Sequence, residues 1–482
     1  MASIKKNFLY ASAYKLLELL LPLITSPLLS RRLGAEGLGA YSYSYAIVSL
    51  FVMVAELGLY RYGMREIAKA KTSQDLLNQT FSDIFATHVV NAAIVITAYY
   101  MIAPLLWGNH PWIFMIQGLS IVGNMIDNAF LFVGMENMRP LVARDTTVKI
   151  VTFILIVILV QQPSDLLLYI VIMCFSSLTA RSIALWYGRH YVSFVKPSVS
   201  NCLRHYRGMF KLMVPVVAEG VYNNIGKLMV GSLFSKSDVG YMELSSKATT
   251  PKTIIASLGT VMCPNIARMH AEGKHQQVRS KFIESFTACM AMSYAVAFGI
   301  SAVAPEFAPW FWGQDFAFCA PLMTGFAISI PFWTVGEVIR NQYLLPTGKD
   351  NQYMAAFLIG VGSLSIFCIL LVPRFGALGA VTSTICAEAV MSIAQTLFIR
   401  GEVPVISPLL GTLPYLCCGA FMLLDVRLFA SVFSIDAGFQ VLAEICIGIL
   451  TFVSTAAIYE AVTKRYLLLR VVAGTLKTMR SR

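Results

Sequence analysis

The chain has 482 residues, of which 57% are hydrophobic and only 13% are charged. A soluble domain usually carries about a quarter charged residues, so this composition excludes an ordinary water-soluble enzyme and indicates a membrane protein. The net charge of +12 would suggest a nucleic-acid partner in a soluble protein. In a membrane protein it is typical of basic cytoplasmic loops, so we expect no nucleic acid.

Fourteen apolar stretches follow along the chain, most of them near the roughly 20 residues that a membrane helix needs. The stretch 147–161 is short, and 240–264 carries several charges. The first stretch is too long for a signal peptide and contains Lys15 and Glu18, so we expect it to stay as an uncleaved span. The ranges are 8–30, 38–60, 84–106, 112–134, 147–161, 166–187, 208–234, 240–264, 283–304, 316–344, 353–373, 376–399, 404–424 and 438–461.

The basic residues predict the orientation of these spans. With the N-terminus in the cytoplasm, 26 of the 37 Lys and Arg residues fall in cytoplasmic segments and 5 on the opposite face. Cytoplasmic loops of membrane proteins carry such an excess. We therefore expect an even number of spans, both termini in the cytoplasm, and a multi-pass protein of the bacterial inner membrane.

An internal repeat relates the two halves of the chain. Gly39 recurs as Gly240 at an offset of 201 residues, and Gly123-x-x-Ile126-Asp127-Asn128 recurs as Gly336-x-x-Ile339-Arg340-Asn341 at an offset of 213. Ser182-Ile183-Ala184 recurs as Ser392-Ile393-Ala394 at 210. Transporters are often built from duplicated halves. The predicted fold is an all-α polytopic membrane protein with 14 transmembrane helices. It has two pseudo-symmetric six-helix lobes (1–190 and 191–400), two additional helices (401–462) and a basic cytoplasmic tail (463–482).

The sequence carries no signature of an enzyme or of a cofactor. The ten cysteines are scattered without metal-ligand spacing, and we find neither a phosphate-binding loop nor a Ser/His/Asp set. The predicted outer loops are short and leave no room for a catalytic domain. We therefore expect no catalytic residues, no metal, no cofactor and no enzymatic activity.

Six cations remain inside the predicted spans, where an ionisable group costs several kcal/mol unless it faces a cavity or a partner. Three of them lie three or four residues from a carboxylate, and such spacing allows neutralisation on one helix face. These pairs are Lys15 with Glu18, Glu243 with Lys247, and Glu337 with Arg340.

Other intramembrane charges have no opposite charge at that spacing, among them Asp127, Arg181, Glu219 and Lys227. Asp127 and Arg340 occupy equivalent repeat positions with opposite sign. One hypothesis therefore pairs these two across the lobes as a gate. Lys252 follows Pro251, and both predict a break in the stretch 240–264 that could line a cavity.

These charges divide into two predicted roles. Cations in a low-dielectric cavity suit a substrate with a diphosphate, whereas buried carboxylates could take up a proton or a sodium ion. The predicted substrate-binding residues are Lys15, Arg181, Lys227, Lys247, Lys252 and Arg340. The predicted ion-coupling or gating residues are Glu18, Asp127, Glu219, Glu243 and Glu337.

Several motifs resemble one family. The opening Pro22-x-x-x-x-Pro27-x-x-Ser30-Arg31-x-Leu33-Gly34-Ala35-Glu36-Gly37-Leu38-Gly39 looks like the first hairpin of bacterial O-antigen and polysaccharide repeat-unit flippases. These belong to the multidrug/oligosaccharidyl-lipid/polysaccharide exporter superfamily. Arg65-Glu66-Ile67-Ala68, Gly134-Met135-Glu136-Asn137 and Pro373-Arg374-Phe375-Gly376-Ala377-Leu378-Gly379 are also similar to that family.

The resemblance implies an inner-membrane flippase for an undecaprenyl-diphosphate-linked oligosaccharide, working by alternating access of two six-helix lobes. Membrane lipids, a proton or sodium ion, and a polysaccharide polymerase and chain-length regulator are the other partners it could have. One departure concerns Gly226-Lys227, where such proteins often carry an acidic residue before the basic one. This departure puts a carboxylate role at that place in doubt unless Glu219 substitutes.

Three alternatives stay open. A peptidoglycan lipid-precursor flippase also binds a lipid diphosphate, and a multidrug/cation antiporter shares the superfamily fold but favours an acidic cavity. From another class, a membrane polysaccharide polymerase or ligase needs a catalytic, arginine-rich outer loop, and only 5 basic residues fall on the outer face.

Overall fold

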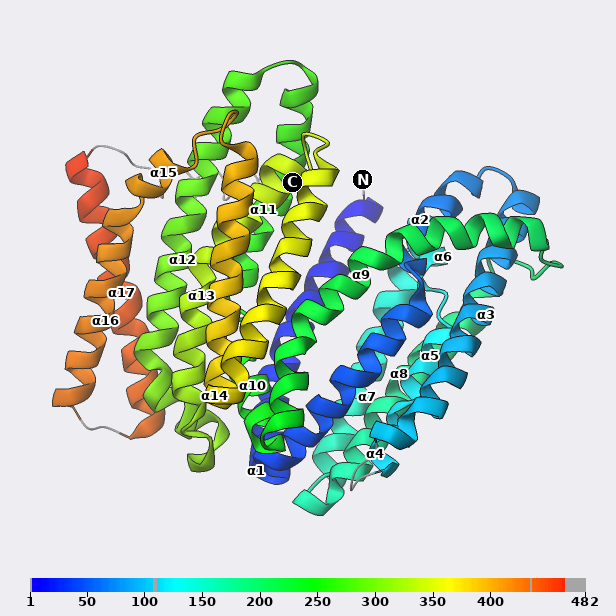
Figure 1. Cartoon of the computed structure of the whole chain (residues 1–482), viewed down its shortest axis with the longest axis horizontal. Helices are drawn as coiled ribbons and strands as arrows, with labels where there is room; N and C mark the ends of the chain where they lie inside the picture. Colours follow the sequence, from blue (N-terminus) through cyan, green and yellow to red (C-terminus); the bar gives the residue numbers. More distant parts are fainter. Residues whose placement is uncertain (1, 107–110, 434–435, 464–482) are drawn as a thin grey trace. The chain divides into compact units, whose positions relative to one another are not determined.

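The computed structural model describes residues 2–106, 111–433 and 436–463, apart from the side chains of residues 2–20, 258, 260 and 261. Every regular element among these residues is a helix (Figure 1). Lipid offers no hydrogen-bond partner to the backbone, so an apolar chain that satisfies its own amides within helices is the expected solution. The predicted tail from residue 464 onward lies outside the described residues.

The helices follow one another in chain order (Figure 1). The first half contains α1 (Ala2–Glu56), α2 (Leu59–Ala70), α3 (Gln74–Leu106), α4 (Pro111–Gln117), α5 (Leu119–Met125), α6 (Ala129–Gly134), α7 (Arg139–Leu159), η1 (Pro163–Asp165), α8 (Leu166–Gly188) and α9 (Val199–Leu233). The second half contains α10 (Lys236–Lys247), α11 (Lys252–Ala271), α12 (His275–Trp312), η2 (Gln314–Phe316), α13 (Cys319–Ile339), η3 (Arg340–Leu344), α14 (Asp350–Ile399), α15 (Ile406–Gly411), α16 (Leu413–Val432) and α17 (Ala437–Thr463).

Nine helical segments in the described part of the chain are long and apolar enough to cross a membrane. Two of them, Leu21–Ala70 and Asp350–Ile399, have 50 residues each. At 1.5 Å per residue, such a helix would extend about 75 Å, more than twice the hydrocarbon core. Three further predicted spans, 147–161, 208–234 and 240–264, also form helices but are not among these nine. The count of 14 and the orientation of the termini stay predictions.

A glycine in a non-helical conformation divides each of the two long segments. Gly34 has φ 70° in α1, and Gly376 has φ 56° in α14. Both values lie in the left-handed region, which a residue without a Cβ adopts at little cost. Gly34 lies between the predicted spans 8–30 and 38–60, and Gly376 is the first residue of the predicted span 376–399. Each long helix can therefore supply two crossings.

Two predicted spans are broken rather than kinked. The break expected at Pro251 and Lys252 is confirmed, because α10 ends at Lys247 and α11 begins at Lys252. The stretch 112–134 was predicted as one span and is one of the nine candidate crossings, but it is not one continuous helix. It forms α4, α5 and α6, with residues 126–128 unwound. The carboxylate of Asp127 accepts a hydrogen bond from the Ala129 amide at 2.9 Å, and such local bonds compete with helical ones.

The chain forms two compact units, Met1–Gly240 and Tyr241–Arg482, called here the N-unit and the C-unit. The N-unit includes α9, which packs against α1 and α3 and which the repeat predicted as the start of the second lobe. In the C-unit, α16 and α17 pack against α12. The Arg427 side chain of α16 donates to the Ala302 carbonyl of α12 at 3.1 Å. The predicted lobe boundary at residue 190 comes from the sequence repeat. The division into packed units does not test it.

Two glycines at equivalent repeat positions meet inside the N-unit. A Cβ at Gly39 would lie 1.6 Å from the carbonyl oxygen of Lys236 and 2.9 Å from the amide nitrogen of Gly240. A Cβ at Gly240 would lie 2.2 Å from the carbonyl oxygen of Ala35. Because backbone cannot move aside as a flexible side chain can, α1 and α10 approach this closely only with glycine at both positions.

We expect Gly39→Ala to lower the free energy of unfolding by about 1–3 kcal/mol, the usual cost of overpacking. The midpoint of thermal unfolding in detergent would measure this loss. Gly362→Ala in α14 is the matched control, because a Cβ there meets no atom within 4 Å. Equal midpoints for the two variants would contradict the close contact.

Candidate substrate and coupling site

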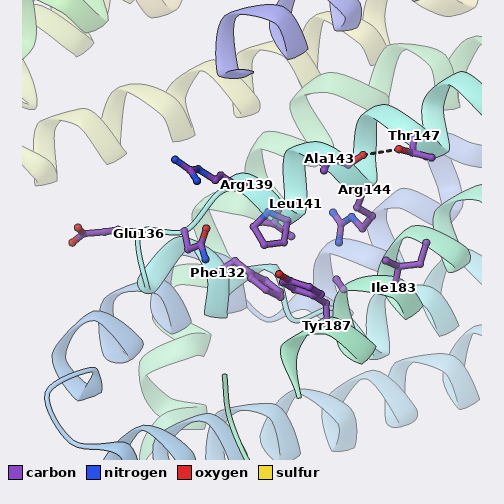
Figure 2. A pocket seen from close by; sticks show the side chains of 12 residues that line it. Phe132, Glu136, Arg139, Leu141, Ala143, Arg144, Thr147, Ile183 and Tyr187 are labelled. Atoms are coloured by element: carbon purple, nitrogen blue, oxygen red, sulfur yellow. Dashed lines mark hydrogen bonds between the residues drawn. The ribbon is translucent and has the colours of Figure 1, made fainter. Parts of the chain in front are cut away.

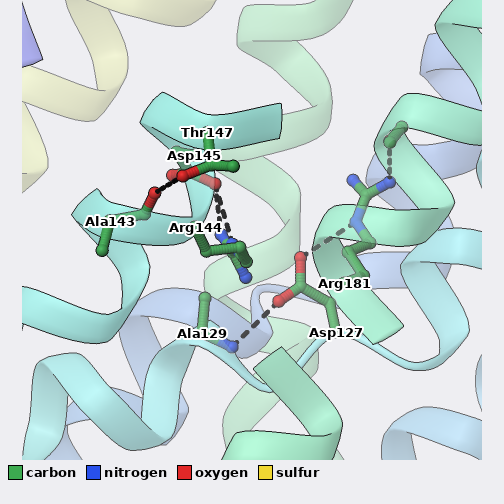
Figure 3. A network of polar contacts seen from close by, with 8 residues as sticks. Asp127, Ala129, Ala143, Arg144, Asp145, Thr147 and Arg181 are labelled. Carbon is green, nitrogen blue, oxygen red and sulfur yellow. Dashed lines mark hydrogen bonds and ion pairs between the residues drawn. The ribbon is translucent and has the colours of Figure 1, made fainter. Parts of the chain in front are cut away.

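Asp127 and Arg181 form an ion pair inside the N-unit. Arg181 Nε lies 3.1 Å from Asp127 Oδ2, and the two side chains are 22% and 26% exposed. Asp127 comes from the unwound segment between α5 and α6, and Arg181 comes from α8. Figure 3 shows the Asp127 carboxylate between the Ala129 amide and the Arg181 guanidinium. The break in the span thus presents a half-buried charge to the neighbouring helix.

A second, more deeply buried pair lies in the C-unit. Arg340 Nη2 lies 2.8 Å from Glu337 Oε2, with side chains that are 8% and 16% exposed. The Gln395 amide completes this pair when its oxygen accepts from Arg340 Nη1 at 3.1 Å and its nitrogen donates to the Gly336 carbonyl at 2.8 Å. Arg340 opens the π-helix η3, and such bulges occur frequently at functional sites.

The two pairs occupy matching places in the repeat. A Cβ at Gly123 would lie 3.2 Å from Arg181 Nη1, and one at the equivalent Gly336 would lie 3.1 Å from Arg340 Nη1. The repeat also places Arg181 opposite Met391, whose sulfur lies 3.6 Å from Arg340 Nη1. Each unit therefore holds a guanidinium against the glycine at this repeat position, Gly123 or Gly336. The two arginines come from helices that are not equivalent in the repeat.

The sequence hypothesis paired Asp127 with Arg340. In the structure each of these residues has a partner within its own unit, and the pairing across the lobes stays a hypothesis. Helix spacing predicts Glu337 as a partner of Arg340, since both lie on one face. The Asp127–Arg181 pair joins residues 54 positions apart, and no local spacing indicates it.

A cavity of about 550 Å³ lies beside Arg181 in the N-unit, called here the N-unit cavity. Side chains of α1, α4, α5, α7 and α8 line it. Its polar lining includes Tyr41, Gln117, Asp145, Lys149 and Arg181. Its volume is in the range of small-molecule sites, which are typically about 300–1,000 Å³.

Three functional candidates in the N-unit were not among the predicted site residues. Lys149, at the start of the predicted span 147–161, was counted among the 26 cytoplasmic basic residues. It lines the N-unit cavity, because α7 begins at Arg139 and carries it inward. Glu56, at the end of α1, interacts electrostatically with Asp127 and Arg181. His88 is fully buried in α3, with Nε2 2.7 Å from the Asn124 carbonyl oxygen.

Among the other predicted cations, Lys252 lies beside the C-unit pair. Its Nζ is 5.3 Å from the centroid of the Trp333 ring, and Glu388 and Glu337 are the negative charges that act on it. Lys247 pairs with Glu243 at 3.0 Å, as their spacing predicts, and its side chain is 48% exposed.

The remaining predicted residues stay apart from these two pairs or cannot be placed. Lys227 is half-buried and Glu219 is exposed, both on α9. The backbone of Lys15 and Glu18 belongs to α1, but their side chains lie outside the described residues. The described residues contain no group of three or more His, Cys, Asp or Glu side chains suited to a metal ion.

The profile of the polysaccharide biosynthesis protein family matches residues 4–270, more than half of the chain. The chain belongs to this family. The family resemblance inferred from the first hairpin is thereby confirmed.

Two relatives of this family member are named for O-antigen transport. The one from Escherichia coli K12 is 23% identical over 414 residues, which cover 83% of this chain and 97% of the relative. The one from Shigella dysenteriae is 19% identical over 400 residues, covering 80% and 98%. These relatives are transporters by name, and none is named as an enzyme.

Solved structures place the fold among transporters. A lipid II flippase MurJ in an inward closed conformation is similar with a TM-score of 0.78 and 13% identity, covering 95% of this chain and all of that one. An inward-facing multidrug transporter of the MATE family has a TM-score of 0.60 and 12% identity, covering 79% and 97%. At such identities the likeness shows the fold alone. Together with the nine apolar helices, it indicates a multi-pass membrane protein.

Proposed function

We propose that the chain is a flippase for an undecaprenyl-diphosphate-linked oligosaccharide, an O-antigen unit or a similar surface polysaccharide unit. It moves this lipid from the cytoplasmic to the periplasmic leaflet of the bacterial inner membrane. The observation that carries the proposal is the family match over a helical membrane fold. Two relatives whose similarity covers about four fifths of the chain are named for O-antigen transport.

The cations support an anionic headgroup as the cargo. Arg181 and Lys149 line the N-unit cavity, and Arg340 and Lys252 both belong to the C-unit, where Glu337 acts on each of them. A guanidinium binds phosphate through charge-assisted hydrogen bonds in a fixed planar geometry. A diphosphate also compensates the desolvation of these cations as it enters. Lys15, Lys227 and Lys247 are further proposed contacts along the path.

The carboxylates are proposed to couple the cycle to a proton or sodium ion. Asp127 and Glu337 each neutralise one of the paired arginines, so a cargo that displaces them frees a carboxylate for a cation. Alternating access then follows as each lobe exchanges an internal ion pair for contacts with the cargo. Glu18, Glu219 and Glu243 are the other proposed coupling groups.

Deletion of the gene in its own host tests this function against its alternatives. We expect surface polysaccharide to disappear while single lipid-linked units accumulate, shielded from a glycosidase added to spheroplasts. Re-expression of the chain should restore the surface polymer. Shielding is the decisive readout, because a unit that cannot cross the membrane stays on the cytoplasmic side.

Each alternative predicts a different outcome of that deletion. Units that accumulate but are open to the glycosidase would indicate a polymerase or ligase. Lysis with loss of peptidoglycan synthesis would indicate the peptidoglycan-precursor flippase, and drug sensitivity with normal polysaccharide would indicate the cation antiporter. Any of these three results would overturn the proposal.

A further inference from the structure

A second cavity of about 810 Å³ lies in the N-unit, where the turn from α6 to α7 meets the end of α8 (Figure 2). It is called here the α7 cavity. Phe132, Asn137, Arg139, Arg144, Thr147 and Tyr187 supply its main lining. None of these residues belongs to the two ion pairs described above, and the predicted topology places this end of the helices at the cytoplasmic face.

The α7 cavity is positively charged. Arg144 lines it with a side chain that is only 11% exposed, and Asp145 accepts from its Nε and Nη2 at 2.8 and 2.7 Å. Its Nη1 is buried and has no hydrogen-bond partner among the described residues. A buried donor without an acceptor is unfavourable, so the guanidinium retains capacity for an anion.

Two other charged residues, Arg139 and Glu136, line the α7 cavity besides Arg144. Arg139, the first residue of α7, lies exposed at the rim of the cavity. Glu136 is the carboxylate in the lining, and its Oε1 lies 2.8 Å from Lys71 Nζ. Figure 2 shows Glu136 directed away from Arg144 and Tyr187. The Arg144 guanidinium is therefore the positive charge inside the cavity, and the exposed Arg139 supplies a second one at its edge.

The walls of the α7 cavity combine flat rings with polar groups. The rings of Phe132 and Tyr187 stack with centroids 6.2 Å apart, and the Asn137 amide donates to the Tyr191 hydroxyl at 2.9 Å. An aromatic face offers apolar area beside a polar edge, which suits a sugar ring. A lone phosphate would leave most of the 810 Å³ empty.

Exposed apolar side chains, called here the apolar rim, lie on the two helices that line the α7 cavity, and Ile183 belongs to its lining. Ile183 and Trp186 of α8 are 41% and 63% exposed, and Ile150 and Ile154 of α7 are 41% and 47% exposed. Tryptophan is enriched at membrane interfaces. A lipid with its headgroup in the cavity can therefore lay its chain along α7 and α8.

From these contacts we propose that the α7 cavity is an entry subsite for the diphosphate-sugar headgroup of the lipid-linked substrate. This inference rests on the proposed flippase function and names a docking position outside the N-unit cavity. Arg144 and Arg139 hold the diphosphate, the exposed ring of Tyr187 holds the first sugar, and the polyprenyl chain covers the apolar rim.

Native mass spectrometry of the full chain in detergent tests the subsite, with undecaprenyl diphosphate as the probe and phosphatidylglycerol in parallel. We expect Arg144→Gln to weaken binding of undecaprenyl diphosphate about tenfold, the effect of losing a charge-assisted contact. Ile183→Trp should give a similar loss by filling the cavity without removing a charge. Arg189→Gln is the matched control, because it removes an exposed cation at the same end of α8.

The possible outcomes separate this inference from the flippase proposal. If Arg144→Gln and Ile183→Trp bind the probe as tightly as the unsubstituted chain, the subsite is wrong and the flippase proposal stands. Phosphatidylglycerol could instead bind the unsubstituted chain as tightly as undecaprenyl diphosphate does, and its binding could weaken equally in the two variants. The cavity would then bind bulk phospholipid, and the inference would be overturned. If the unsubstituted chain fails to restore surface polysaccharide in the deletion strain, the proposed function fails whatever the binding result.

Discussion

Glu337→Ala should lower the free energy of unfolding by about 3–5 kcal/mol, the usual cost of removing one partner of a buried ion pair. Arg340 is 8% exposed and lies 2.8 Å from Glu337. The substitution leaves this guanidinium with the Gln395 amide and the Met391 sulfur, neither of which carries a charge. The midpoint of thermal unfolding in detergent, measured on protein purified at matched levels, would record the loss.

The chain offers a closely matched control for that experiment. Lys281 and Glu284 are also three residues apart on one helix and 2.7 Å from each other, but their side chains are 51% and 33% exposed. Exposed pairs contribute about 0–1 kcal/mol, so Glu284→Ala should change the midpoint little. Similar losses for the two variants would show that burial adds nothing to the Arg340 pair.

Exchanging the charges of Asp127 and Arg181 should restore transport that either single exchange abolishes. Asp127→Arg or Arg181→Asp alone places like charges within about 3 Å, which costs several kcal/mol. We expect each single variant to lower surface polysaccharide at least tenfold, since 1.4 kcal/mol already corresponds to a factor of ten. The double variant should recover a substantial part of it.

The readout is surface polysaccharide in the deletion strain, normalised to the amount of chain in the membrane. Glu272→Lys is the control, because Glu272 forms an exposed pair with Lys274 in the turn after α11, and its loss should leave transport unchanged. A double variant as inactive as the single ones would show that Asp127 and Arg181 act separately rather than as a pair.

Sequence predicts those contacts of the candidate site that join residues close together in the chain, and it does not predict those that join distant residues. Spacing along one helix predicts Glu243–Lys247 and Glu337–Arg340, because residues three and four apart share a helix face. It cannot predict Asp127–Arg181, which depends on how α8 packs against the unwound segment. Nor can it predict that Lys149 lines a cavity. Charge counting placed Lys149 among the cytoplasmic residues at the edge of the predicted span 147–161, whereas α7 begins eight residues before that span.

The sequence by itself determined the membrane character, the repeat and the family, because hydropathy, charge bias and motifs are properties of neighbouring residues. It also located the break at Pro251, since proline removes a backbone donor. Only the tertiary structure decided which charges meet, where the stretch 112–134 unwinds, and that Gly123 and Gly336 each make room for a guanidinium. Those outcomes depend on the rotation and packing of helices, which are set by side chains distant along the chain.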